Sequence, residues 1–255
     1  MLSVIIPTYN DAEKILVAVA SAIQVKSVNE IIIIDDYSKD NTEELLKNVI
    51  KKNKKIKYFK NKKNIGSGLS FIKGIQKINN KYLIMLNSDD FFIPEGIEKL
   101  LNFIRKFDLD VAYGKMAIKK NNEVFQFTHP GYKKNSYVRS RDEFLDLLIY
   151  DMYMPSFGTV IKKKAINQFY DTNYYNNLKL EYGGEFKAHD YDLFINLAKQ
   201  KKKFGFLNEI VCVWCQTRES QSGEKYFNSG DACFESSFLF NKYFKNTYID
   251  KKNLF

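Results

Sequence analysis

The sequence predicts an α/β protein built on a mostly parallel sheet, with helices on both faces and a mixed C-terminal half. Three observations support this fold class. Short apolar runs alternate with segments of helical periodicity as far as residue 107. The run at residues 31–34 is apolar throughout, as expected of a parallel strand that is buried on both faces. Polar clusters follow three of these runs, at the strand ends where such sheets bind ligands.

In the first half, four predicted strands alternate with four predicted helices. Pro7 closes the first apolar run, and Asp11 is the expected N-cap of the helix after it. Pro94 suits the first turn of a later helix. The expected strands span residues 2–7, 31–34, 55–61 and 81–87. The expected helices span residues 11–24, 42–53 and 94–107, and a glycine-opened loop leads into another helix within residues 64–79.

The second half follows a different pattern. A strand pair is expected to turn at Asn121 and Asn122, and Ser140 is the expected cap of a helix that extends to residue 152. The remaining elements are a strand returning toward a helix at 156–166, a helix at 188–203, a strand at 204–214 and a helical tail from 226.

The chain shows no internal repeat and no low-complexity linker. We therefore expect a single domain with a nucleotide-binding half at residues 1–107, an acceptor-binding half at 108–225 and a tail at 226–255.

The composition argues against several classes of protein. Of the 255 residues, 45% are hydrophobic and 27% are charged, and no apolar run approaches the ~18 residues of a membrane-spanning helix. The first residues lack the basic leader of a secretory signal, so we expect a cytoplasmic protein. The net charge of +10 lies in short lysine runs interleaved with asparagine. That pattern is typical of solvated surface, and we expect no nucleic-acid partner.

The cysteines are odd in number and show no disulfide pattern. Cys212 and Cys215 are spaced like half of a metal knuckle, but the second half is missing. We therefore expect Cys212, Cys215 and Cys233 to be buried thiols, with zinc as the less favoured alternative.

Four motifs occur in order along the chain: SVIIPTYN, IIIIDDYSKDNT, LNSDDFFIP and HDYDLFINLA. Their order and spacing resemble those of the family 2 glycosyltransferases with the GT-A fold, over residues 2–222. The first three are specific as a set, although each alone is weak. The resemblance implies a Rossmann-like nucleotide half and an inverting, metal-dependent transfer of a sugar from a nucleotide-sugar.

The first two motifs are expected to bind the nucleotide. By resemblance, Pro7, Thr8 and Tyr9 border a uracil or an equivalent base, and Asp36 accepts a hydrogen bond from a base N–H. Asp35 is assigned to the same site. For either acid, the alternative is a cap on the following helix.

Gly66 and Lys73 complete the predicted nucleotide site. Gly66 would let the backbone approach a ligand, although a loop glycine is as often only a turn. Family members commonly carry Ala-Arg-Asn after this loop, where this chain has Ser70-Phe71-Ile72. That departure removes an arginine contact to the nucleotide, and Lys73 is the candidate substitute.

The segment Asn87-Ser88-Asp89-Asp90 corresponds to the acidic motif of the family, usually Asp-Ser-Asp-Asp or Asp-Ala-Asp-Asp. A departing diphosphate builds up negative charge, which Mn²⁺ or Mg²⁺ held by carboxylates neutralises. Asp90 is the predicted metal ligand, and Asp89 is expected to contact the metal or the donor sugar. Asn87 lacks the usual charge and is expected to affect donor contacts. The alternative is an acidic surface turn.

Asp190 is the predicted catalytic base, because it matches the aspartate of the family's Glu-Asp pair. An inverting transfer needs a base that takes the proton from the acceptor hydroxyl. A helix N-terminus favours the ionised carboxylate. His189 replaces the acid of that pair and is expected to orient or tune Asp190. The alternative is that Asp190 only caps its helix.

The remaining predicted contacts lie in the second half. Many relatives carry a histidine just before a Ser-x-Ser, a region where this chain has Arg218. Arg218 is the candidate clamp for the diphosphate, with a surface arginine as the alternative. Trp214, Tyr153 and the aromatic segment 170–182 are expected to shape the acceptor site.

These motifs predict transfer of a hexosyl or N-acetylhexosaminyl group from a UDP-sugar to a glycan or lipid-linked acceptor, in bacterial surface polysaccharide synthesis. A nucleotidyltransferase is one rival, but no glycine-rich phosphate loop follows the first strand. A non-catalytic nucleotide-binding or membrane scaffold is the other. The basic, aromatic tail either packs as a helix or contacts an anionic membrane surface.

Overall fold

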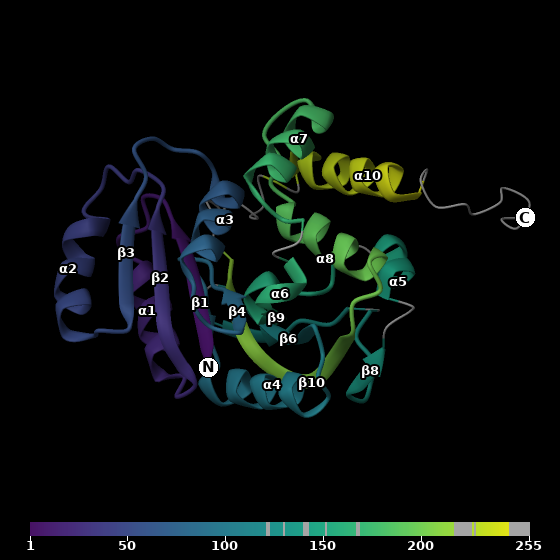
Figure 1. The fold of residues 1–255 in the computed structure, drawn as a ribbon, viewed down its shortest axis with the longest axis horizontal. Coiled ribbons are helices and arrows are strands. Elements are labelled where there is room, and N and C mark those ends of the chain that lie inside the picture. The colour runs from purple at the N-terminus through teal and green to yellow at the C-terminus, as the bar shows by residue number, and fades with distance from the viewer. Residues whose placement is uncertain are drawn as a thin grey trace, which may run out of the picture.

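A computed structural model describes residues 1–120, 123–129, 131–139, 143–150, 152–166, 169–216, 226 and 228–244. Within these residues the strands form one ten-stranded mixed sheet, with helices on both faces (Figure 1). The strands are β1 (Leu2–Thr8), β2 (Val28–Asp35), β3 (Ile56–Lys60), β4 (Tyr82–Met85), β5 (Phe91–Phe92), β6 (Val111–Lys120), β7 (Glu123–Gln126), β8 (Tyr137–Arg139), β9 (Thr159–Lys162) and β10 (Phe204–Cys215). The helices are α1 (Ile15–Gln24), α2 (Thr42–Lys52), α3 (Ser67–Lys77), α4 (Pro94–Lys106), α5 (Glu143–Tyr150), the 3₁₀ turn η1 (Ser156–Gly158), α6 (Lys163–Ile166), α7 (Thr172–Tyr182), α8 (His189–Lys199) and α10 (Asp231–Phe244).

The sheet has the order β3-β2-β1-β4-β9-β6-β10-β5. The first four strands run parallel, whereas β9 is antiparallel to both of its neighbours. Strands β6 and β10 are parallel to each other, and the short β5 closes the far edge against β10. The chain therefore forms a parallel first half that continues, without a break in the sheet, into a mixed second half.

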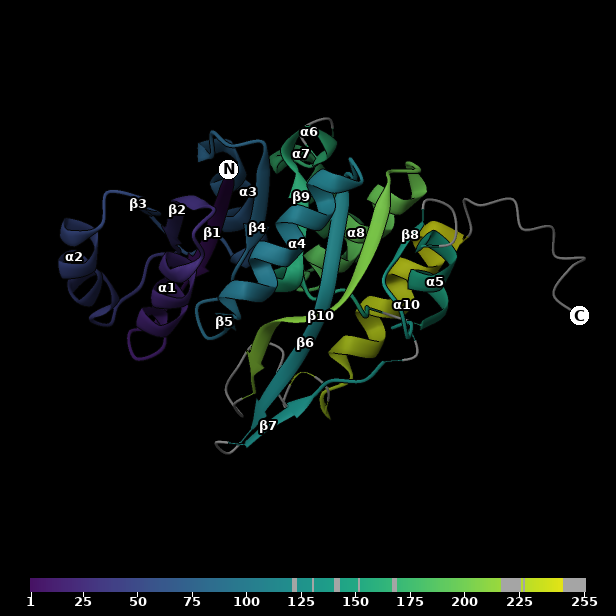
Figure 2. The ribbon, with the colours of Figure 1, turned by 90° about the horizontal axis from the view of Figure 1, so that it is seen from below.

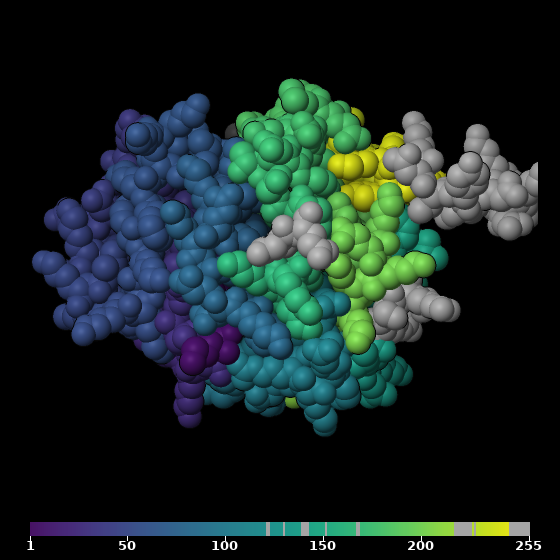
Figure 3. All heavy atoms as spheres, in the orientation of Figure 1, coloured from purple at the N-terminus to yellow at the C-terminus, as the bar shows by residue number. Residues whose placement is uncertain are grey.

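Side-chain alternation in β1 divides the core into two layers. Ile5 packs into a cluster with α3 and α8, whereas Val4 and Ile6 pack on the opposite face with α1 and α4. Successive residues of a strand point to opposite faces, so the apolar positions of β1 serve both layers. In Figure 3 the two halves of the chain are in direct contact across the middle of the molecule.

The second half extends the sheet outward and adds helices above it. Strands β6 and β7 pair antiparallel and project from one end of the molecule (Figure 2). Helix α10 lies beside α7, and Lys242 of α10 pairs with Glu181 of α7 at 3.4 Å (Figure 1). The predicted turn at Asn121 and Asn122 and the predicted cap Ser140 lie outside the described residues.

Two local predictions were wrong. Asp11 does not cap α1, which begins at Ile15; instead its main-chain oxygen accepts hydrogen bonds from Lys14 N and Ile15 N. Cys233 is exposed and Cys215 is only partly buried, whereas Cys212 is buried as expected. The exposure of Cys233 follows from its place on α10, whose buried face carries Glu235, Leu239 and Tyr243. No helix within the described residues is long and apolar enough to cross a membrane.

Candidate functional site

The loops that follow β1 and β2 are joined by hydrogen bonds. Asn10 N donates to Ser38 Oγ at 3.0 Å, and Lys39 N donates to Asn10 Oδ1 at 2.8 Å. Asn10 and Tyr37 have left-handed backbone angles, with φ of 54° and 74°. Asparagine tolerates that region, but for tyrosine it is unfavourable and must be held by the surrounding contacts. These two loops therefore form one ordered edge above the parallel strands.

The predicted base-binding residues of β1 lie at this edge. Pro7 is partly buried, Thr8 is buried, and Tyr9 is 46% exposed. The Thr8 hydroxyl has no hydrogen-bond partner among the described residues. A buried hydroxyl without a partner costs free energy, so a ligand that bonds to Thr8 would remove that cost.

Asp35 is fully buried and bonded within the protein. Its carboxylate accepts a hydrogen bond from Ser38 N at 2.6 Å and another from the Tyr58 hydroxyl, and Lys60 Nζ lies 3.9 Å away. These contacts order the turn after β2. A direct contact between Asp35 and the nucleotide stays a prediction.

Asp36 organises the loop that opens on Gly66. It accepts hydrogen bonds from Asn61 Nδ2 at 2.9 Å, Ile65 N at 2.9 Å and Gly66 N at 2.8 Å. Gly66 has φ of 90°, a conformation that favours glycine. Lys73 Nζ donates to Asn61 Oδ1 at 2.9 Å. The structure thus brings Asp36, Gly66 and Lys73 together, as one bonded group.

The acidic motif begins two residues after the end of β4. Asp90 is 1% exposed and accepts hydrogen bonds from Cys215 N and Asn87 Nδ2, both at 2.8 Å. Burial raises the pKa of Asp90 well above its ordinary value, and the neighbouring charge of Asp89 raises it further. Asn87 therefore orients Asp90, and Asp90 in turn fixes the end of β10.

Asp11 is a third acid at this corner. Its carboxylate accepts a hydrogen bond from the Ser88 hydroxyl, and Lys14 Nζ lies 3.8 Å from it. Burial raises the pKa of Asp89, and the charge of Asp11 raises it further, whereas Lys14 acts in the opposite direction. No local pattern indicates this role, because 77 residues separate Asp11 from Ser88.

The donor set at this corner fits a divalent cation that is shared with a diphosphate. In the part of the chain that the structure describes, no group of three or more His, Cys, Asp or Glu side chains is arranged as a metal cage. Mg²⁺ at phosphate sites needs only one or two carboxylates, because the phosphates and water supply the other ligands. Adjacent buried carboxylates with raised pKa values are stabilised by such a charge.

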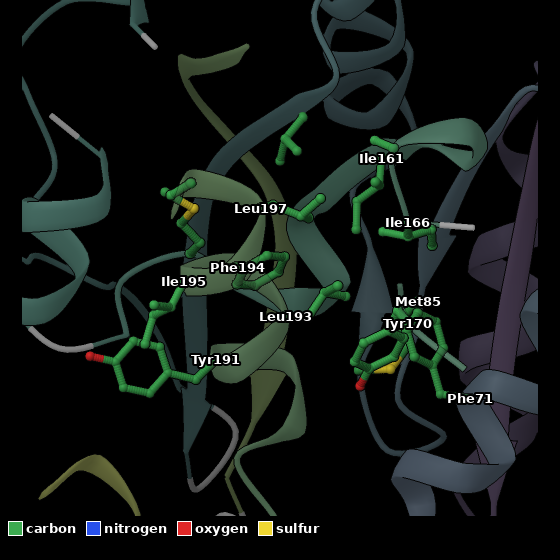
Figure 4. Packing of buried hydrophobic residues seen from close by; sticks show 14 of the residues in the cluster. Phe71, Met85, Ile161, Ile166, Tyr170, Tyr191, Leu193, Phe194, Ile195 and Leu197 are labelled. Atoms are coloured by element: carbon green, nitrogen blue, oxygen red, sulfur yellow. The ribbon is translucent and has the colours of Figure 1, made fainter. Parts of the chain in front are cut away.

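Asp190 lies in the first turn of α8 and is partly buried. Its Oδ1 accepts a hydrogen bond from Tyr191 N at 2.9 Å. It lines one small cavity with Ser156, with Met85 at the end of β4 and with apolar side chains that include Phe71. Figure 4 shows Phe71, Met85 and Tyr170 gathered beside α8. The fold therefore brings the predicted base next to the strand end that carries the acidic motif.

His189 is a core residue. It is 4% exposed, and its ring lies 6.2 Å from the Phe71 ring and 6.1 Å from the Tyr175 ring. The Tyr170 hydroxyl lies 3.4 Å from Nδ1. Burial lowers the pKa of His189, although the charges of nearby acids act against this. The His189 ring is thus enclosed by aromatic side chains, and its role in orienting Asp190 stays a prediction.

The residues expected to shape the acceptor site differ in their exposure to solvent. Tyr153 is 1% exposed, and its hydroxyl donates to Glu143 Oε2 at 2.8 Å. Tyr170 and Tyr175 are also buried in the core, whereas Trp214 at the end of β10 is partly exposed. Arg218 lies outside the described residues. Among the described residues of this set, Trp214, Tyr174 and Tyr182 are partly exposed, so they can meet a ligand.

Comparison with known proteins agrees with this fold. Residues 3–169 match the family described as Glycosyl transferase family 2. An uncharacterized glycosyltransferase of Methanocaldococcus jannaschii is 24% identical over 217 residues, which cover 83% of this chain and 69% of that protein. The poly(ribitol-phosphate) beta-N-acetylglucosaminyltransferase TarP of Staphylococcus aureus is 38% identical over 122 residues, which cover 46% of this chain and 37% of TarP.

Solved structures are similar over most of the chain. S. aureus TarS residues 1–349 in complex with UDP-GlcNAc gives a TM-score of 0.67 at 20% identity, covering 86% of this chain and 59% of that one. The mannosyltransferase PcManGT of Pyrobaculum calidifontis, in complex with GDP-Man and Mn²⁺, gives 0.67 at 12% identity, covering 96% and 64%. The likeness confirms the predicted α/β fold of GT-A type. This chain spans less than two thirds of the length of either structure.

Proposed function

The chain belongs to glycosyl transferase family 2, and from this premise we propose that it transfers a hexosyl or N-acetylhexosaminyl group from a UDP-sugar to a hydroxyl of a glycan or lipid-linked acceptor. Transfer proceeds with inversion at the anomeric carbon. The observation that carries the proposal is the shared cavity of Asp190 and Met85, which places a carboxylate beside the strand end that leads to Asp89 and Asp90.

The nucleotide binds at the joined loops after β1 and β2. The unpartnered Thr8 hydroxyl and the exposed Tyr9 ring offer a polar group and a flat surface to the nucleoside. A carboxylate has about four acceptor sites, and Asp36 uses three of them within the protein. The remaining site accepts a hydrogen bond from the base. Lys73 acts through Asn61 and Asp36.

We assign different contacts to Asp89 and Asp90 at the acidic corner. Asp90 is the proposed metal ligand, because the two hydrogen bonds that orient it leave about two acceptor sites free. Asp89 is more exposed than Asp90, and we assign it a contact to the same ion or to the donor sugar. When bound, Mn²⁺ or Mg²⁺ neutralises the charge that develops on the departing diphosphate.

Asp190 is the base of the transfer. Its carboxylate accepts the proton of the acceptor hydroxyl as that oxygen attacks the anomeric carbon. Asp190 lies in the first turn of α8, beside the cavity that reaches the end of β4. Ser156 and Phe71 line the same cavity.

The donor base and the acceptor are inferred from relatives. TarP is named for β-N-acetylglucosaminyl transfer, and TarS was solved with UDP-GlcNAc, whereas PcManGT was solved with GDP-Man. The UDP-GlcNAc complex of TarS supports a UDP-sugar as donor, and a bacterial surface polysaccharide is the acceptor class that we propose. The reaction is placed in the cytoplasm, at the inner face of the membrane where lipid-linked acceptors are found, and the whole chain is taken as one transferase domain.

A donor panel tests the proposal. UDP-, GDP- and dTDP-sugars are screened by thermal shift with and without Mn²⁺, because a ligand that binds the native state raises its melting point. The donor that binds is then supplied with acceptor extract, and release of the nucleoside diphosphate is measured. Asp190→Asn should lower the rate by about 10² to 10⁴-fold without loss of donor binding.

Glu44→Gln is the matched control for that variant. Glu44 is an exposed acid in the first turn of α2, as Asp190 is an acid in the first turn of α8. The control should keep the wild-type rate. Donor binding without any transfer would favour the scaffold alternative, and an Asp190→Asn protein that transfers at the wild-type rate would remove Asp190 from the mechanism.

A further inference from the structure

Helix α8 lacks a cap from its own flanking side chains, and α10 supplies one. The N-cap residue Ala188 makes no side-chain cap. Glu235 of α10 accepts hydrogen bonds from Lys187 N at 2.8 Å and from Ala188 N at 2.9 Å, although 48 and 47 residues separate these partners. Glu235 is 2% exposed, and the Tyr226 hydroxyl also donates to it at 2.6 Å. A carboxylate at this end of a helix is favoured by the helix dipole.

Helix α10 also holds α8 at a second point. Asp192 is fully buried and accepts hydrogen bonds from the Tyr243 hydroxyl at 2.8 Å and the Tyr174 hydroxyl at 2.7 Å. Lys242 Nζ lies 3.5 Å from the same carboxylate. A buried carboxylate is costly unless it is bonded in this way, so Asp192 strongly prefers to stay at α10.

The two contact points lie on either side of Asp190 in the sequence. Asp190 and Asp192 are two residues apart, which separates them by about 200° around the helix axis. When Asp192 is held against α10, Asp190 therefore points to the opposite side of α8. That side lines the cavity with Met85 and Ser156. Glu235 fixes the start of the helix, and Tyr243 fixes its rotation.

We propose that α10 is a positioning element of the transfer site, in which Glu235 and Tyr243 hold α8 in the rotation that points Asp190 at the end of β4. The inference rests on the proposed function, because it concerns the base of that reaction. Neither side chain needs to touch the substrate. Both act through α8, so their loss should impair the transfer step more than donor binding.

Kinetics of two α10 variants test this directly. Glu235→Gln keeps the side-chain shape but replaces one carboxylate oxygen by an NH₂ group. That group cannot accept the hydrogen bond that a backbone N–H of Lys187 or Ala188 now donates. Tyr243→Phe keeps the ring and removes the donor to Asp192. With the donor selected from the panel, kcat should fall by about 10 to 100-fold in each variant, since small displacements of a catalytic group have effects of this size. The donor KM should change by less than about twofold.

Phe234→Ser is the control on the same helix. Phe234 neighbours Glu235 but is 69% exposed, and its replacement should leave kcat unchanged. Hydrogen exchange gives a readout that does not depend on activity. The amides of Lys187 and Ala188 should exchange faster in Glu235→Gln than in wild type or in the control. Unchanged exchange would contradict the role of Glu235 as a cap.

A double-variant comparison separates positioning from general destabilisation. In an Asp190→Asn background, Glu235→Gln and Tyr243→Phe should cause no further loss of rate, because the group they position is already gone. A further loss equal to that seen in wild type would overturn the inference. Should Glu235→Gln fail to fold, the Tyr243→Phe series still decides the question.

The outcomes distinguish the inference from the proposed function. If Asp190→Asn keeps the wild-type rate, the proposed base is wrong and the role of α10 falls with it. If Asp190→Asn abolishes transfer while both α10 variants keep the wild-type kcat, only the role of α10 is overturned.

Discussion

Gly68→Ala should destabilise the protein, although alanine is the better helix former. Gly68 lies in the first turn of α3, and an added Cβ would be 2.5 Å from Cζ and 2.7 Å from the hydroxyl oxygen of Tyr175. Non-bonded carbon atoms prefer about 3.5–4.0 Å, so the ring would have to retreat by about 1 Å. Tyr175 is 2% exposed, and its hydroxyl donates to Phe186 O at 2.6 Å.

The size of the effect follows from three contributions. Overpacking a well-filled core costs about 1–3 kcal/mol, and loss of the Tyr175 hydrogen bond costs about 1 kcal/mol. Replacing glycine by alanine within a helix returns up to about 1 kcal/mol. We therefore expect a net loss of about 1–3 kcal/mol in the free energy of unfolding. The displaced Tyr175 would also release the segment that leads into α8, so transfer activity should fall.

Urea denaturation measures this prediction, with Gly184→Ala as the control. A Cβ on Gly184 would meet no atom within 4 Å, so that change should be neutral or stabilising by up to about 1 kcal/mol. The urea midpoint should fall for Gly68→Ala, with an unchanged slope. A Gly68→Ala protein as stable as wild type would show that the Tyr175 ring has room to move, and would refute the packing argument.

Three further predictions follow. Without metal, the urea midpoint should fall as the pH rises, because the native Asp89–Asp90 pair binds protons more tightly than the unfolded chain does. This stabilisation is present below the ordinary aspartate pKa and is lost as the pH rises through the raised pKa values of the native pair. The Asp89→Asn variant should show a flatter dependence of the urea midpoint on pH. Cys233, which is exposed, should react with a thiol reagent in the native protein, whereas Cys212, which is buried with a raised pKa, should react only after unfolding. Asp36→Asn should lower the free energy of unfolding by about 1–3 kcal/mol, measured in urea, because an amide cannot accept all three hydrogen bonds that the carboxylate accepts.

The sequence predicted the parallel first half well because its signals are local. Apolar runs and glycine or proline boundaries marked β1 to β4, and their polar ends marked Asp36, Asp89 and Asp90. Helix α7 was missed, although its signals are also local. Asp171 caps it through a 2.8 Å hydrogen bond to Tyr174 N, and Gly183 ends it with φ of 87°. Its many tyrosines and asparagines give it no clear apolar period.

Other features were not available from the sequence, because their partners are distant along the chain. Strand β5 has only two residues and exists through pairing with Cys212 and Val213 of β10. Glu235 belongs to an ordinary amphipathic helix until the fold brings it to Ala188. A local pattern reports which face of a helix is apolar, but not which buried acid on that face meets the amides of another helix.

The acidic corner shows why an enzyme of this kind keeps carboxylates in an unfavourable place. Among the described residues, Lys14 alone forms an ion pair with the group Asp11, Asp89 and Asp90, and it pairs with Asp11, at 3.8 Å. One lysine beside three acids leaves excess negative charge, and the raised pKa values of Asp89 and Asp90 record its cost. A purely structural turn would gain stability by replacing one of these acids with a neutral residue, as Asn87 already does at the first position. Keeping Asp89 and Asp90 as adjacent acids therefore makes sense if a cation and a diphosphate occupy the corner during the reaction, since stability given up at one point is a common feature of functional sites.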